Sequence, residues 1–293
     1  MRRLASSFAL LGLSIVAACG GGELASSASS SGGAAGTTDR TTRGFVVTIL
    51  NFTRQTKPGA REGFDLDDTV SVGADERSCF KQDAVDESGR EGIDNELSGI
   101  IPTVDELFKG AADGLIQSSI RDGQLVLLGE LRGVDDLVDD PSVELVIVGG
   151  KKAHPSLGTD GVIEGFQTFS ADPSVTSDAS KTGRIEGGVF HAGPMDLAVP
   201  IAIFEISFTL HLKNVRFRAK VDEDGGLDGL FGGGIVIQEL LDGVGKDGAN
   251  SQYIPMMRLA MEASADLAPD ADGVCRQLSA ALAFRARPAF VRW

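Results

Sequence analysis

The clearest pattern in the chain is an alternation of apolar and polar residues between positions 204 and 221. The apolar residues lie at even positions before Asn214 and at odd positions after it: Phe204, Ile206, Phe208, Leu210 and Leu212, then Val215, Phe217, Ala219 and Val221. A period of two is typical of a β-strand with one buried face. A slip of one residue turns such a strand over, so we expect a β-bulge or a bend at Asn214.

Weaker patterns outline the rest of the chain after residue 43. Alternating or β-branched segments predict strands over residues 44–53, 124–134, 142–150 and 278–291. Apolar residues at helical spacing predict helices over residues 95–101, 104–120, 235–241 and 254–265, with the first ending before Pro102. Residues 225–234 are rich in glycine and are interpreted as a turn.

These elements predict an α+β fold that is mainly antiparallel β, β-sandwich-like, with two to four packed helices. No second linker rich in Ser, Gly or Pro follows residue 43. We therefore expect residues 44–293 to form a single β-rich domain.

The first residues have a different pattern. Met1-Arg2-Arg3 precedes an apolar run over residues 8–18, and Cys19 follows. A short basic start, an apolar core and small residues before a cut site are typical of an export signal. The run is too short to span a bilayer, which needs about 20 apolar residues. The alternative is an ordinary signal peptide with an incidental cysteine.

The sequence Val16-Ala17-Ala18-Cys19 resembles a lipobox. This resemblance implies that residues 1–18 are a signal peptide of a bacterial lipoprotein. It also implies that Cys19 receives a diacylglyceryl group and becomes the first mature residue. Gly20, in place of Asp, implies the outer membrane by the sorting rule of that family. Residues 19–43 would then be the lipidated cysteine and a flexible tether rich in Gly and Ser.

The charge of the chain limits its partners. Its formal charge is −15, and loss of residues 1–18 would lower it to −17, because that segment contains Arg2 and Arg3 and no acid. So acidic a surface repels phosphates, which argues against nucleic-acid binding. The expected partners are the membrane, through the lipid, and an unknown protein or other envelope ligand.

The cysteine count predicts a disulfide. Cys19 is assigned to the lipid, which leaves Cys79 and Cys275. Exported proteins fold in oxidising surroundings, where a remaining pair usually bonds. The alternative is two buried thiols.

Three acidic loops could hold a cation. They lie at residues 63–68, 83–96 and 266–273, and the latter two resemble thrombospondin type 3 and dockerin-like calcium loops. Ca²⁺ binds six to eight oxygen ligands, which closely spaced Asp side chains supply. The candidate ligands of a structural Ca²⁺ are Asp65, Asp67, Asp86, Asp94, Asp270 and Asp272. The alternative is that these are ordinary turn residues.

Evidence for catalysis is thin. His154, His191 and His211 show no metal-ligand spacing, and no G-x-S-x-G or phosphate-loop motif occurs. We therefore expect a non-catalytic binding or structural domain. Two alternatives remain open, namely a carrier of a hydrophobic ligand and a secreted hydrolase that uses clustered carboxylates.

A basic stripe is a local exception in this acidic chain. It consists of Lys213, Arg216, Arg218 and Lys220, of which the last three share one strand face. It is interpreted as a solvated strand face, and the alternative is a contact with an anionic partner.

Overall fold

A computed structural model divides the chain into two units, residues 1–37 and residues 38–293. The structure describes residues 41–55, 57–107, 112–203, 206–246, 248 and 252–293. The predicted signal peptide, Cys19 and most of the tether lie outside these residues, as does Phe204. The described part consists of ten strands and four helices: β1 Thr41–Phe52, α1 Leu97–Leu107, α2 Ala112–Arg121, β2 Leu127–Val134, β3 Asp140–Gly150, β4 Gln167–Thr176, β5 Ser180–Glu186, β6 Val189–Ile203, β7 Ile206–Val221, β8 Leu227–Val236, α3 Ile237–Gly245, α4 Ile254–Ser264, β9 Leu267–Pro269 and β10 Cys275–Arg292.

The strands form one sheet that closes on itself. Antiparallel pairs run from β1 through β2, β3, β5, β6, β7, β8 and β10, and β10 pairs with β1 again. β4 lies outside this ring and pairs antiparallel with β3 and parallel with the end of β10. The predicted class, α+β and mainly antiparallel β, is confirmed. The sandwich-like arrangement takes the form of a single closed sheet instead of two separate ones.

Apolar side chains from every strand of the ring form one continuous core cluster. They include Val47, Leu131, Leu145, Ile185, Leu197, Val215, Phe231 and Phe284. Phe217, Phe231 and Phe284 pack together with ring centroids 5.4 to 6.2 Å apart. Aromatic pairs at this separation add to the stabilisation that burial of their area provides.

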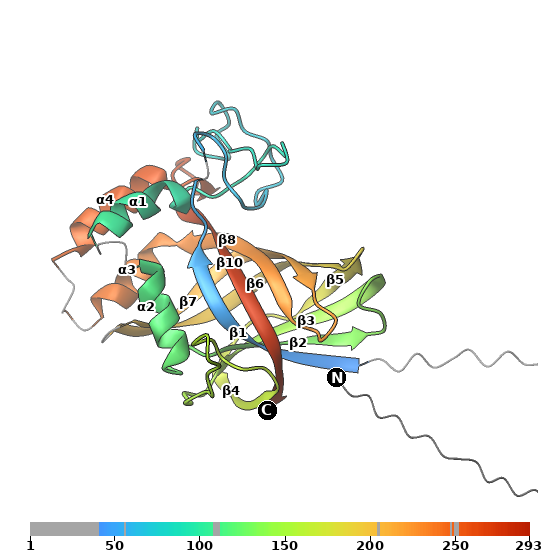
Figure 1. The fold of residues 1–293 in the computed structure, drawn as a ribbon. Coiled ribbons are helices and arrows are strands. Elements are labelled where there is room, and N and C mark those ends of the chain that lie inside the picture. Colours follow the sequence, from blue (N-terminus) through green and yellow to red (C-terminus); the bar gives the residue numbers. More distant parts are fainter. Residues whose placement is uncertain (1–40, 56, 108–111, 204–205, 247, 249–251) are drawn as a thin grey trace, which may run out of the picture. The chain divides into compact units, whose positions relative to one another are not determined.

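The helices gather at one end of the ring (Figure 1). α2 contacts β1, α3 contacts β7 and α4, and both α1 and α4 contact β10. Side-chain hydrogen bonds hold α2 in place: Asp113 accepts from the Phe52 N–H at 2.9 Å, and Gln117 donates to the Thr48 carbonyl at 2.8 Å. None of the helices in the described ranges has the length and hydropathy needed to cross a bilayer.

The bulge predicted at Asn214 is confirmed. The register between β7 and β8 shifts between Lys213 and Arg216, and Asn214 has a φ of 55°. Asn tolerates this left-handed conformation better than most residues. Its side-chain amide donates to the Leu66 carbonyl, so the bulge also binds the connection between β1 and α1.

Two element predictions are wrong. The glycine-rich segment is not a turn but most of strand β8. A Cβ at Gly229 would lie 2.2 Å from the Arg218 carbonyl oxygen, and one at Gly232 would lie 2.9 Å from the Phe64 ring. These glycines therefore permit close approach of neighbouring segments. Helix α1 continues through Pro102 to Leu107 instead of ending before it. The second predicted helix, 104–120, therefore falls partly in α1 and partly in α2, and residues 108–111 lie outside the described part.

Candidate metal centre

The acidic residues near the start of the body lie in the long connection between β1 and α1. Isolated β-bridges fold this connection on itself, pairing Ala60 with Val85, Phe64 with Asp94, and Ala84 with Ile93. The bridge at Phe64 brings the first acidic loop beside the end of the second. Local backbone pairing therefore places residues that are about 30 positions apart next to each other.

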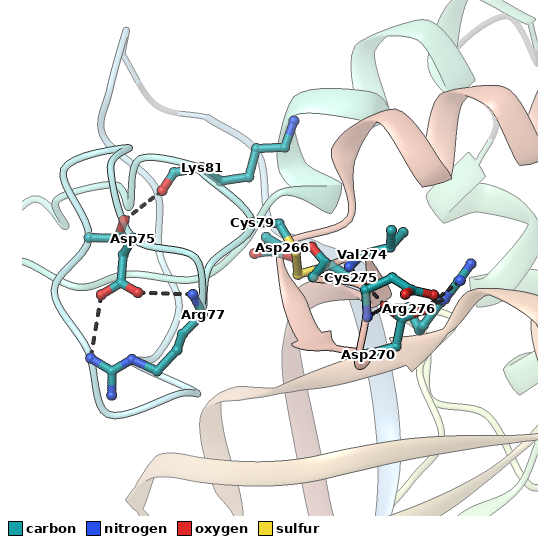
Figure 2. The surroundings of a disulfide bond; sticks show 12 residues. Asp75, Arg77, Cys79, Lys81, Asp266, Asp270, Val274, Cys275 and Arg276 are labelled. Atoms are coloured by element: carbon teal, nitrogen blue, oxygen red, sulfur yellow. Dashed lines mark hydrogen bonds and ion pairs between the residues drawn. A yellow bond between two sulfur atoms is a disulfide. The ribbon is translucent and has the colours of Figure 1, made fainter.

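The predicted disulfide is confirmed. Cys79 and Cys275 are bonded across a sequence separation of 196 residues, with a Cα–Cα distance of 5.9 Å. Figure 2 shows the bond joining the loop that carries Asp75 and Arg77 to the β9–β10 hairpin. Lys81 adds a second link, because its ammonium donates to the Ala263 carbonyl at 2.6 Å.

Three of the six predicted ligands converge. Each of Asp65, Asp67 and Asp94 has a carboxylate oxygen within 4.8 Å of the other two. Asp94 is buried, whereas the other two are half-buried. The Leu66 N–H donates to Asp94 at 2.6 Å, and the Thr69 N–H donates to Asp67 at 2.9 Å. This spacing allows the three carboxylates to bind one cation.

The environment of Asp94 and Asp67 opposes the ionisation of their carboxyl groups. Burial raises the pKa of Asp94 to about 9, against the hydrogen bond from the Leu66 N–H. Neighbouring negative charges raise this pKa further, from Asp266, Asp67 and Asp83. Burial also raises the pKa values of Asp67 and Asp83. Without a cation, Asp94 holds a proton that a free aspartate would lose at neutral pH.

Two further acids belong to the group although they were not among the predicted ligands. Asp83 makes a hydrogen bond with Asp94 and accepts the Ser71 N–H at 2.6 Å. Asp266 is 3 % exposed, and burial raises its pKa to about 7 despite two hydrogen bonds from Ser279. Both residues lie inside the acidic loops defined in the sequence, but their burial depends on segments distant in the chain.

The other three predicted ligands lie elsewhere. Asp86 accepts hydrogen bonds from Ser88 and pairs with Arg90 at 3.1 Å. Burial alone would raise the pKa of Asp86, but these contacts outweigh burial and lower it. Asp270 accepts the Val274 N–H and pairs with Arg276 at 2.5 Å, and both contacts lower its pKa. Asp272 is exposed. These three residues therefore fit the alternative of turn residues.

The basic stripe contacts acids of the same chain. Arg216 pairs with Asp68 at 2.8 Å, and Arg218 pairs with Glu62 at 3.5 Å. Arg218 also lies over the Phe64 ring at 5.6 Å. The stripe thus fixes the first acidic loop on β7. This role differs from both interpretations of the stripe, a solvated strand face and a contact with an anionic partner.

The geometry bears on the two alternative functions. A carrier needs an apolar cavity of about 300 Å³ or more. Two hollows on the described surface have a mixed lining: Asp222, Asp224 and Arg287 with Phe166 and Pro288 in one, and Asp75, Glu76 and Arg77 with Val70 and Val72 in the other. The converging acids are packed within a folded loop, whereas a hydrolase requires carboxylates that face a substrate.

No protein family, curated protein or solved structure matches this chain in comparisons of sequence and fold.

Proposed function

We propose that this chain is a membrane-anchored lipoprotein of the cell envelope whose body is a non-catalytic binding or structural module stabilised by calcium. The lipobox-like sequence ending at Cys19 supports export and anchoring, with the outer membrane as the destination. A tightly packed ring tied by a disulfide supports a rigid module that presents its surface to a protein or another envelope ligand.

The observation that carries the calcium proposal is the convergence of Asp65, Asp67 and Asp94. Three carboxylates so close together repel one another unless a proton or a cation neutralises them. A divalent ion with a preference for oxygen ligands does this at neutral pH, when free protons are scarce. Asp83, which contacts Asp94, is available as a fourth ligand.

Thermal unfolding of the full mature protein, with the disulfide oxidised, tests the calcium site. We expect the melting temperature to be higher with excess Ca²⁺ than with excess chelator, because a ligand that binds only the native state stabilises it. The Asp94→Asn variant removes a ligand and a buried ionisable group together. It should lose the response to Ca²⁺ without losing stability in chelator.

Asp272→Asn is the matched control, because Asp272 is exposed and lies apart from the cluster. It should keep the full response to Ca²⁺. Equal melting temperatures of the wild-type protein in calcium and in chelator would refute the calcium site. The anchor is tested separately by labelling cells with radioactive palmitate, which should mark the wild-type protein and not Cys19→Ser.

A further inference from the structure

The hollow beside the β7–β8 turn has the size and lining of a small-molecule site. Its volume is about 380 Å³, and it lies between the segment that precedes β4, the turn itself and the last part of β10. Sites for small molecules begin at about 300 Å³ and combine apolar walls with a few polar groups. Because carboxylates and apolar side chains line the same hollow, it suits a ligand that has both a charge and an apolar part.

The β7–β8 turn provides the polar groups of this hollow. The Asp222 N–H donates to the Gly226 carbonyl at 2.9 Å, and the Gly226 N–H donates to the Asp224 carboxylate at 3.0 Å. A Cβ on Gly226 would lie 3.2 Å from an Asp224 carboxylate oxygen and 3.4 Å from an Asp222 carboxylate oxygen. It would also lie 3.2 Å from the Ala286 carbonyl oxygen. Three acceptor oxygens therefore converge beside Gly226, where the missing side chain leaves the space between them open.

Phe166 and Pro288 provide the apolar part of the lining. The φ of Phe166 is 60°, an uncommon conformation for a non-glycine residue, and its N–H donates to the Pro288 carbonyl at 2.6 Å. The side chain is nevertheless 63 % exposed. A backbone conformation of this kind persists where the surroundings enforce it, and it is frequent at ligand sites. An exposed aromatic face beside carboxylates attracts an organic cation.

The charge of the hollow is negative. The guanidinium of Arg287 is already bound, because it pairs with Asp160 at 3.2 Å and donates to the Ile163 carbonyl at 3.1 Å. Neither Asp222 nor Asp224 pairs with a basic side chain of the described part. Arg43 lies beside the turn, with a guanidinium nitrogen 3.7 Å from a Cβ built on Gly225. Even when Arg43 is counted, the two carboxylates leave an excess of negative charge.

We propose that this hollow binds a small molecule that carries a primary alkylammonium group. The three N–H donors of such a group match the three oxygens of Asp222, Asp224 and Ala286, and the alkyl chain lies along Phe166. Ca²⁺ fits less well, because it needs six to eight oxygen ligands and three protein oxygens converge here. The hollow shares no residue with the metal centre, so the inference is independent of calcium and of the lipid anchor.

Calorimetric titration of the full chain with n-butylammonium tests the site, with the disulfide oxidised and calcium at saturation. We expect a dissociation constant below about 1 mM. N,N,N-trimethylbutylammonium has the same charge and no N–H donor, so it should bind about tenfold more weakly or not at all. Equal affinities for the two cations would overturn recognition by hydrogen bonds, and no binding of n-butylammonium would overturn the site.

A pair of double variants locates the binding. Asp222→Asn/Asp224→Asn should lower the affinity about tenfold or more, and the turn should remain, because an asparagine oxygen still accepts the Gly226 N–H. Asp242→Asn/Asp272→Asn is the matched control, since it removes two exposed carboxylates elsewhere, and it should keep the wild-type affinity. Equal losses in the two double variants would mean attraction by net charge alone and would overturn the proposed site.

Discussion

Removal of the disulfide offers a strong test of how the body is stabilised. The Cys79→Ala/Cys275→Ala variant opens a covalent loop with a sequence separation of 196 residues. The loop-closure entropy of the unfolded chain gives a stabilisation of about 5 kcal/mol for a loop of this length. Residual structure in the unfolded chain reduces that figure, so we expect a loss of about 3–5 kcal/mol in the free energy of unfolding.

Urea unfolding at constant pH and saturating calcium measures this loss, with Trp293 fluorescence and circular dichroism as two probes. A lost cross-link also lets the unfolded chain expand, so the slope of the free energy against urea should rise in the variant. The wild type in reductant is the second comparison and should resemble the variant. A loss below about 1 kcal/mol, with an unchanged slope, would refute the loop-closure reasoning.

Three further predictions concern single positions. In chelator, the free energy of unfolding should rise between pH 7 and pH 5. The reason is that the raised pKa values, about 9 for Asp94 and about 7 for Asp266, make the folded state bind protons more tightly than the unfolded state. Asp94 alone would contribute up to about 3 kcal/mol, and a smaller rise in Asp94→Asn would confirm its share. Asn214→Gly should lower the free energy of unfolding by about 1 kcal/mol, because it loses the hydrogen bond to the Leu66 carbonyl. Asn214→Ala should lower it by about 1 kcal/mol more, because alanine disfavours the positive φ at this position. Equal losses for the two variants in urea unfolding would contradict this division. Gly44→Ala should lower the free energy of unfolding by about 1–3 kcal/mol, because its Cβ would meet the Ala289 carbonyl. Gly114→Ala in α2 is the control and should not lower the free energy of unfolding in the same assay, because a Cβ there meets nothing within 4 Å.

Periodic patterns predicted half of the strands, namely β1, β2, β3, β7 and β10, because a half-buried strand has alternating apolar and polar residues in its own sequence. The change from even to odd apolar positions at Asn214 located the bulge for the same reason. The closure of the sheet into a ring has no such pattern in the sequence. Whether β10 returns to β1 depends on the twist and the length of all the strands together, which no local pattern contains.

The glycines of β8 show a second limit. Glycine lowers strand propensity, so the local signal for residues 227–234 favours a turn. The strand forms because Phe64, Val215 and Gln277 approach its backbone from other segments. A prediction from this stretch alone has no information about those contacts.

The sequence identified some acids of the candidate metal centre and missed others, for similar reasons. Asp65, Asp67 and Asp94 stood out as closely spaced acids, and the fold brings them together. Asp266 lies between the buried residues Ala265 and Leu267, so alternation would place it in solvent. It is buried because Ser279 on β10 provides its hydrogen bonds. The carboxylates of Asp86 and Asp270, by contrast, accept hydrogen bonds from N–H groups of their own turns and pair with nearby arginines.

The closed pairing of the eight strands has a consequence for molecules crowded on a surface. A tethered protein meets its neighbours at a far higher local concentration than the same protein in solution. An open sheet at that density offers unpaired backbone N–H and C=O groups, which are a template for joining one molecule to the next. In the ring, each strand already has a partner on both sides. A dense layer of these molecules can therefore remain a layer of separate molecules.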